Sequence, residues 1–149
     1  MNYPFNVRVY GLLINAAGEI LLSDEEEYGV RFTKFPGGGL EYGEGLRDGL
    51  KREFMEECLA EIEVLDHFYT TDFYIRSAFN ESQIISVYYR VREVRPLALA
   101  FKERAFDFDA GGDLRQSFRW VPVSELSPDD VTFETDKRVV ELLTAQASS

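Results

Sequence analysis

The stretch from Gly38 to Ala60 reads GGLEYGEGLRDGLKREFMEECLA. Pro36 and Gly37 precede it, and the run Pro36-Gly37-Gly38-Gly39 predicts a loop with unusual backbone angles, because this run favours neither helix nor strand. Further on, apolar residues recur at the spacing of one helical face, at Leu46, Leu50, Phe54 and Cys58. We therefore predict a glycine loop followed by a helix from about Gly45 to about Cys58.

Three glutamates crowd the apolar face of this predicted helix. Glu57 falls in the middle of the apolar stripe, Glu53 lies at its edge, and Glu56 lies one step further round. Like charges at this spacing destabilise a helix, and burying them costs more. A cation is expected to compensate, and hard divalent cations prefer carboxylate and carbonyl oxygens. The alternative, a solvated acidic face, would place the carboxylates opposite the stripe.

The same stretch resembles the Nudix box, G-x5-E-x7-R-E-U-x-E-E-x-G-U, where U is a bulky aliphatic residue. Gly38, Glu44 and the run Arg52 to Glu57 match this pattern. Leu59 stands where the family has Gly, and Ala60 is small for the last position. Because a left-handed Leu is strained, we expect Leu59 to be right-handed or extended, with its side chain packed inward.

The resemblance implies an α/β fold, the Nudix α/β/α sandwich, with a mixed β-sheet between the box helix and a C-terminal helix. It covers the chain as one domain, residues 1–149. The metal ligands that it implies are the Gly37 carbonyl and three carboxylates, those of Glu53, Glu56 and Glu57. Arg52 matches an arginine that orients the glutamates, and Glu44 matches a supporting glutamate. The catalytic residues expected by this resemblance are Glu53, Arg52, Glu57 and Glu44.

Nudix proteins typically hydrolyse a nucleoside diphosphate linked to another group, with Mg²⁺ or Mn²⁺. The resemblance thus implies a small-molecule nucleoside diphosphate derivative as substrate and attack of activated water on phosphorus. The general base stays open between Glu53 and an acid of a later segment, among Glu103, Asp107, Asp109 and Asp113. Three basic side chains are candidate phosphate partners: Arg8, Arg31 and Lys34.

Two other classes of function are weighed against hydrolysis. A Nudix-fold sensor of nucleotides or of ADP-ribose-type ligands would need no catalysis, but the chain retains every box carboxylate. A Nudix-type isomerase of isoprenoid diphosphates would want a catalytic cysteine in a separate strand. Cys58, the single cysteine, lies on the apolar stripe, where an inert buried thiol is expected.

The amino-acid composition limits which partners and which cellular compartment are expected for the protein. The 149 residues carry a net charge of −11, which argues against nucleic acid as a partner, because there is no excess of Lys and Arg. A polyanionic substrate therefore also requires bound cations. No apolar run approaches the length of a membrane span, and residues 1–4 lack the pattern of a secretory signal. One cysteine fits a reducing cytoplasm. We expect a cytoplasmic monomer or homodimer.

The remaining elements follow from alternation of apolar residues and from turn signals. The sole histidine, His67, falls in a predicted strand and is expected to be structural. The acidic run Asp24 to Glu27 is expected to be a solvated loop. The predicted strands cover residues 5–14, 19–23, 31–35, 61–73, 83–94 and 116–121, and a closing amphipathic helix covers 134–145.

Overall fold

The computed structural model describes residues 5–147, which form two compact units. Unit 1 contains residues 5–12 and 37–97, and unit 2 contains residues 13–36 and 98–147. Each unit is treated by itself below. The prediction about a secretory signal concerns residues 1–4, which lie outside the described residues.

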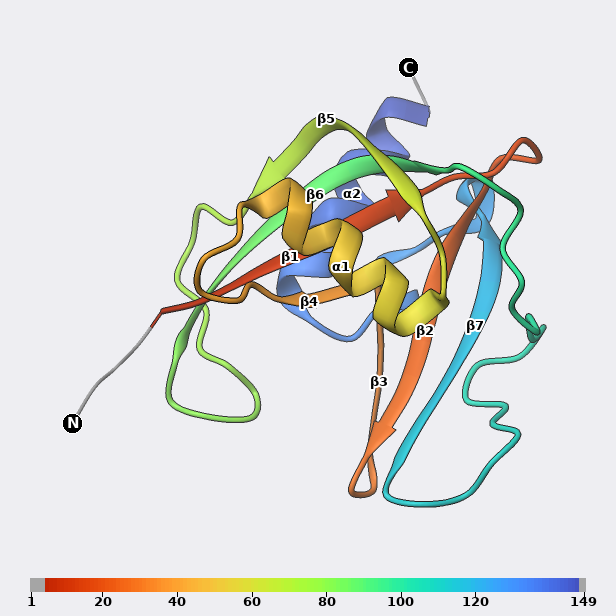
Figure 1. The fold of residues 1–149 in the computed structure, drawn as a ribbon, viewed down its shortest axis with the longest axis horizontal. Helices are drawn as coiled ribbons and strands as arrows, with labels where there is room; N and C mark the ends of the chain where they lie inside the picture. Colours follow the sequence, from red (N-terminus) through yellow and green to blue (C-terminus); the bar gives the residue numbers. More distant parts are fainter. Residues whose placement is uncertain (1–4, 148–149) are drawn as a thin grey trace. The chain divides into compact units, whose positions relative to one another are not determined.

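Unit 1 is built on a mixed sheet in the order β4-β1-β6-β5. β4 pairs antiparallel with β1, and β5 pairs antiparallel with β6. Figure 1 shows β1 and β6 running in the same direction, so the sheet combines both kinds of pairing. The strands are β1 (Phe5–Leu13), β4 (Gly37–Gly39), β5 (Ile62–Thr70) and β6 (Gln83–Glu93). His67 lies in β5 as predicted, where it is exposed and bonded to Thr70 at 2.7 Å.

The glycine run corrects one prediction. Gly37–Gly39 forms the strand β4, with Gly37 opposite Tyr10 and Gly38 opposite Val9, and is therefore not a loop. Gly37 does have an unusual backbone angle, with φ of 145°. A Cβ at Gly37 would stand 2.1 Å from the carbonyl oxygen of Val9. The missing side chains let this strand pair closely with β1 and satisfy its backbone groups, which outweighs the low strand propensity of glycine.

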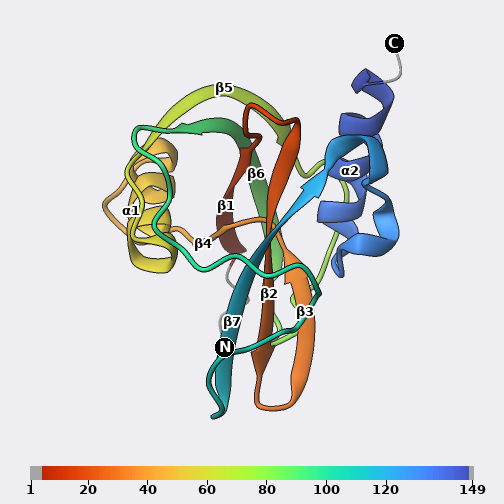
Figure 2. The same cartoon turned by 90° about the vertical axis from the view of Figure 1, so that its right-hand side faces the viewer.

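The helix α1 (Leu46–Cys58) lies along one face of this sheet (Figures 1 and 2). Its buried residues include Leu50, Phe54 and Cys58 of the predicted apolar stripe, which confirms the stripe at these three positions, while Leu46, its first member, is half-buried. Gly11 of β1 accommodates Phe54, since a Cβ at Gly11 would stand 2.5 Å from the ring. The helix begins after Gly45 and ends at Cys58, as its sequence pattern predicts.

Unit 2 is built on an antiparallel sheet in the order β3-β2-β7. Two 3₁₀ turns follow the last strand and contact the C-terminal helix, visible at the blue end of the chain in Figure 2. Residues 98–113 have little regular structure. The elements are β2 (Glu19–Glu27), β3 (Val30–Lys34), β7 (Leu114–Pro122), η1 (Val123–Glu125), η2 (Pro128–Asp130) and α2 (Glu134–Ala147).

The acidic run Asp24 to Glu27 corrects a second prediction. It continues β2 and is not a solvated loop: Asp24 is 0% exposed and Glu26 is 6% exposed. Arg119 donates to Asp24 at 2.7 Å, and Arg115 and Arg31 both bond to Glu26. Buried carboxylates are stable only when they are paired and hydrogen-bonded. These arginine partners come from neighbouring strands, which keeps the acidic strand buried.

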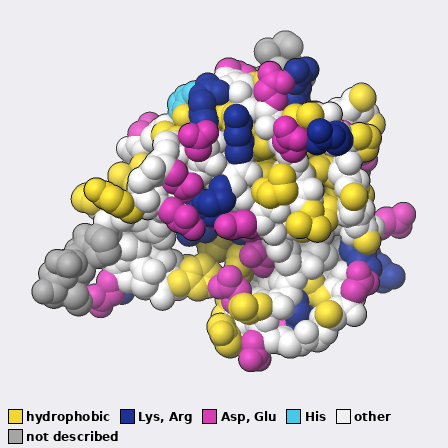
Figure 3. All heavy atoms as spheres, in the orientation of Figure 1, with side chains coloured by type: hydrophobic (Ala, Val, Ile, Leu, Met, Phe, Trp, Pro, Cys, Tyr) yellow, Lys and Arg dark blue, Asp and Glu magenta, His cyan; other side chains and the backbone are white. Residues whose placement is uncertain are grey.

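The predicted α/β class, with a mixed sheet, a box helix and a C-terminal helix, is confirmed. Within residues 5–147, neither helix is long and apolar enough to cross a bilayer. On the face that Figure 3 shows, basic and acidic side chains are interspersed. Exposed ion pairs among the described residues include Arg92 with Glu63 and Arg95 with Glu61.

Candidate metal and hydrolase site

The three glutamates of α1 differ in their surroundings. The side chain of Glu53 is 13% exposed and that of Glu56 is 57% exposed. Glu57 is partly buried, and its Oε2 accepts a hydrogen bond from the backbone N–H of Gly37 at 3.1 Å. Glu53 and Glu57 therefore turn inward as predicted, while Glu56 stays at the surface.

The bare backbone of β4 makes room for Glu53. A Cβ at Gly38 would stand 2.7 Å from Oε2 of Glu53, which is too close for a side chain. Gly38 thus lets the Glu53 carboxylate approach the strand closely, and Gly37 supplies an N–H to Glu57. The two carboxylates consequently lie against one short glycine strand.

Arg52 ties the helix to the turn that precedes it. Its Nη2 donates to Glu44 at 2.6 Å and to the Gly39 carbonyl at 3.0 Å. Its Nη1 donates to Glu53 at 3.2 Å and to Glu56 at 3.1 Å. Charge-assisted bonds of this kind are strong and orient both partners. The orienting role that the box resemblance implied for Arg52 agrees with this geometry.

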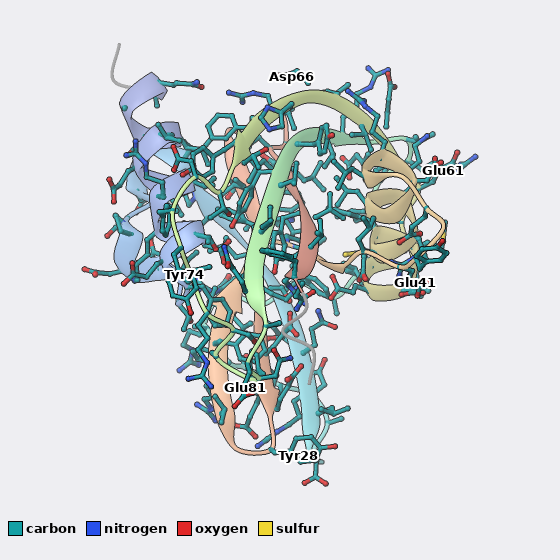
Figure 4. All side chains as sticks on the ribbon, turned by 90° about the vertical axis from the view of Figure 1, so that its left-hand side faces the viewer. Tyr28, Glu41, Glu61, Asp66, Tyr74 and Glu81 are labelled. Atoms are coloured by element: carbon teal, nitrogen blue, oxygen red, sulfur yellow. The ribbon has the colours of Figure 1, made fainter. Side chains whose placement is uncertain are left out.

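Glu44 is held from two sides. Its Oε1 also accepts a hydrogen bond from the backbone N–H of Glu41 at 2.8 Å, and Figure 4 shows Glu41 beside α1. The hydrogen bonds from Arg52, and then the one from Glu41, lower the pKa of Glu44 to about 2. In turn the hydrogen bond to Glu44 raises the pKa of Arg52. The pair is therefore fully charged over the physiological pH range.

Arg8 brings a second guanidinium to the same region. It lies on β1 opposite Gly39, and its Nε donates to the Tyr10 hydroxyl at 2.5 Å. Burial lowers the pKa of Arg8, and contact with Tyr10 raises it. The charges of Glu53 and Glu57 raise it as well, and the net pKa lies above its ordinary value. Arg8 is thus electrostatically coupled to both inward carboxylates.

The other two candidate phosphate partners belong to unit 2 and are engaged by carboxylates. Lys34 is buried, with its ammonium 3.0 Å from Glu25. Arg31 is half exposed, bonds to Glu26 at 2.9 Å and lies over the Phe106 ring. The four later acids that were candidates for the general base are exposed residues of unit 2, and Asp109 bonds to Lys102. These assignments stay predictions.

The donors on α1 fit a hard cation by their chemistry, since all are carboxylate oxygens next to a glycine backbone. Among residues 5–147, however, no three acidic, histidine or cysteine side chains gather closely enough to hold a metal ion. Nη1 of Arg52 bonds both Glu53 and Glu56 in this arrangement.

A family model described as the NUDIX domain matches residues 4–143. The chain belongs to the NUDIX family. The match spans residues of both units, and the predicted class of a Nudix hydrolase is confirmed. Nudix hydrolases generally use divalent cations. A comparison with curated proteins found no match.

Several solved structures share the Nudix fold. A MutT protein from Methanosarcina mazei is 19% identical, with a TM-score of 0.72 and coverage of 100% of this chain and 99% of that one. A NUDIX hydrolase from Nitrosomonas europaea is 18% identical, with a TM-score of 0.69 and coverage of 96% and 89%. An ADP-ribose pyrophosphatase from Streptococcus suis is 15% identical, with a TM-score of 0.60 and coverage of 96% and 91%.

One contact of this region was missed from the sequence, the bond between Arg8 and Tyr10. Its signal was present, because residues two apart on a strand lie on the same face. The sequence pattern did not show that the Tyr10 hydroxyl would turn toward Arg8, since strand tyrosines usually serve as core residues.

Proposed function

We propose that this Nudix hydrolase is a metal-dependent enzyme that cleaves the diphosphate bond of a nucleoside diphosphate-linked substrate. The observation that carries the proposal is the approach of Glu53 and Glu57 to the glycine strand β4. Inward carboxylates beside a bare backbone are suited to a hard cation and to phosphate oxygens bridged by it. The NUDIX family acts on nucleoside diphosphate derivatives, which supports the same substrate class.

A bound Mg²⁺ or Mn²⁺ would be held by the Gly37 carbonyl and the three glutamates of α1, and would neutralise diphosphate oxygens and acidify a bound water. The chain's own residues supply the rest. Arg52 of α1 fixes the position of Glu44 relative to the helix. Glu56 is the most exposed of the three α1 glutamates, so its side chain can turn away from Arg52. Glu53 or one of the later acids takes the proton as water attacks phosphorus.

The competing reading is a Nudix-fold sensor that binds a nucleotide or an ADP-ribose-type ligand without cleaving it. If this hypothesis holds, the protein should bind such a ligand without hydrolysing it. The isomerase reading is disfavoured, because Cys58 is buried in α1 at 1% exposure. A cytoplasmic location, the lack of a nucleic-acid partner and a monomeric or homodimeric state stay predictions, as does the single-domain organisation of residues 1–149.

The test is a panel of nucleoside diphosphate derivatives with Mg²⁺, with each cleavage product identified. ADP-ribose is included because one structure of the same fold is named an ADP-ribose pyrophosphatase. Glu56→Gln and Glu57→Gln should each lower kcat/KM by about 100-fold or more while the protein stays folded. The matched control is Glu63→Gln, which alters an exposed ion pair with Arg92 and should leave kcat/KM unchanged. Near-normal rates in both variants, or cleavage of a plain phosphate monoester alone, would overturn the proposal.

A further inference from the structure

The C-terminal end of α1 presents apolar side chains at the surface of unit 1. Met55 is 48% exposed, and Leu59, one helical turn further on, is 78% exposed. Val94 is 49% exposed, and its N–H bonds to the Glu61 carbonyl at 3.0 Å, which brings it close to the segment that follows Leu59. Figure 3 shows hydrophobic side chains gathered over this end of α1, to the right of centre. The α1 patch consists of Met55, Leu59 and Val94.

Leu59 is an unfavourable residue for its position in the isolated chain. Its backbone is left-handed, with φ of 51°, a conformation that Gly adopts freely and Leu adopts only with strain. Because its side chain is mostly exposed, burial offsets little of this strain. Backbone strain and exposed apolar area are both features of functional surfaces. The combination favours a surface that becomes covered when a partner binds.

Charged side chains of both signs border the α1 patch. Glu61 comes two residues after Leu59 and bonds to Arg95 at 2.6 Å, and both side chains are exposed. Glu63 and Arg92 face each other on β5 and β6 and form a second exposed pair. In Figure 3 basic and acidic side chains lie beside the hydrophobic ones. The border therefore suits a partner that presents both signs of charge.

The charges of the border distinguish three kinds of partner. An anionic membrane surface would be repelled by the glutamates and by the net charge of −11. A strongly acidic or strongly basic protein would leave part of the border facing like charge. A second copy of the chain, related by a two-fold axis, brings the apolar centre onto itself and turns each arginine toward a glutamate. The mixed border therefore fits a second copy best.

We propose that the α1 patch is the centre of a symmetric homodimer interface, in which Leu59 and Met55 pack across the two-fold axis and Arg95 of one copy meets Glu61 of the other. A two-fold contact is closed, so assembly stops at the dimer. The apolar centre is small beside that of an obligate dimer, so the dissociation constant is on the order of 100 µM. Dimer formation requires neither metal nor substrate and is therefore independent of the proposed function.

The first experiment measures the dissociation constant by sedimentation equilibrium of the full-length protein, from about 10 µM to about 1 mM. Leu59→Ala should raise this constant by about tenfold or more, because each dimer buries the side chain twice. The matched control is Leu114→Ala, which shortens a 65% exposed leucine of unit 2 and should leave the constant unchanged. Met55→Gln should act in the same direction as Leu59→Ala.

Three results of the first experiment would overturn the proposal. They are a monomer up to about 1 mM, an assembly larger than a dimer, and equal dissociation constants in Leu59→Ala and Leu114→Ala. Circular dichroism checks that each variant is folded, and Met55→Gln decides the outcome if Leu59→Ala is not. Salt at about 0.15 M screens the mutual repulsion of the two acidic chains in every measurement.

The second experiment tests the two-fold pairing at the border. Arg95→Glu gives each copy like charges at these two positions, and so does Glu61→Arg, so each variant alone should dimerise about tenfold more weakly or worse. Mixed in equal amounts, the two variants should associate as tightly as the unaltered protein, because opposite charges meet across the axis. Fluorescence anisotropy of one labelled variant, titrated with the other, measures this recovery. No recovery in the mixture would overturn the symmetric arrangement.

Discussion

Leu59 has a left-handed backbone, with φ of 51° and ψ of 36°, and a side chain that is 78% exposed. The expectation of a right-handed or extended, inward-packed Leu59 was therefore wrong. The neighbouring bonds give the reason: the Leu59 N–H bonds the Met55 carbonyl at 3.1 Å, and the Ala60 N–H bonds that of Phe54 at 3.3 Å. Since Ala60 and Ile62 are buried, the chain must reverse at residue 59, and the reversal requires a left-handed residue.

Leu59→Gly should stabilise the protein. It relieves the strain of a left-handed Leu, while the added freedom of the unfolded chain offsets part of the gain, leaving about 0.5–1 kcal/mol. Thermal unfolding should show a higher Tm than that of the unaltered protein. Leu59→Ala, which removes the exposed side chain but keeps a Cβ, is the control and should leave Tm nearly unchanged. A lower Tm for the glycine variant would contradict this explanation.

Glu44 should make stability depend on acidity. Its pKa falls from an ordinary value of 4.5 to about 2 in the folded protein. A depressed folded-state pKa contributes stability that is present above the unfolded value and is lost as pH falls. We expect urea unfolding to show a loss of stability between about pH 4.5 and about pH 2, and a smaller loss in Glu44→Gln. Identical pH dependence in the two proteins would contradict the assignment.

At the level of single elements, β2 shows how a strand can carry buried acids. Asp24 accepts from Arg119 of β7 and from Thr33 of β3, which bonds to it at 2.6 Å. Ser23 and Lys34 serve Glu25 in the same way. The acids thus take their cationic partners from neighbouring strands, and Ser23 of β2 itself adds one hydrogen bond to Glu25.

Arg119→Met should destabilise unit 2 strongly. It leaves the buried Asp24 carboxylate without its cation, which costs about 3–5 kcal/mol. Denaturant unfolding measures the loss of stability. The control is Arg138→Met, which breaks an exposed ion pair with Glu141 and should change the free energy of unfolding by less than about 0.5 kcal/mol. The double variant Asp24→Leu with Arg119→Met should recover part of the stability. A mild effect of Arg119→Met alone would show that water, and not the arginine, satisfies Asp24.

For the whole molecule, the charges place a limit on metal-free stability. The chain carries a net charge of −11, and the cations near the glutamates of α1 include Arg52 and Arg8. A bound cation is expected to relieve this repulsion, and binding to the folded state alone stabilises that state by an amount that grows with the logarithm of the cation concentration above its dissociation constant.

Addition of Mn²⁺ should therefore raise the unfolding temperature of metal-free protein. At 100 times its dissociation constant the cation should add about 2.7 kcal/mol, and chelation should reverse the shift. The rise should be much smaller in Glu57→Gln, because Glu57 belongs to the expected ligand set. An equal rise in both proteins would place the stabilising metal elsewhere.

The local periodicity of the sequence determined the box helix and its inward glutamates. A helix is set by contacts within a few residues, so the repeat from Leu46 to Cys58 was sufficient to predict its span, and the spacing of Glu53 and Glu57 showed that they turn inward. The box motif likewise identified the family without any knowledge of tertiary contacts.

Only the tertiary structure decided the rest. Gly37–Gly39 became a strand because β1 offered close backbone pairing, and Asp24 became buried because Arg119 lies 95 positions later in sequence yet beside it in the sheet. The turn of Leu59 was set by the need to bury Ala60, and the orientation of Arg8 by a hydroxyl fixed through Tyr88. Each outcome depends on partners distant in sequence, whose positions exist only once the sheets have formed.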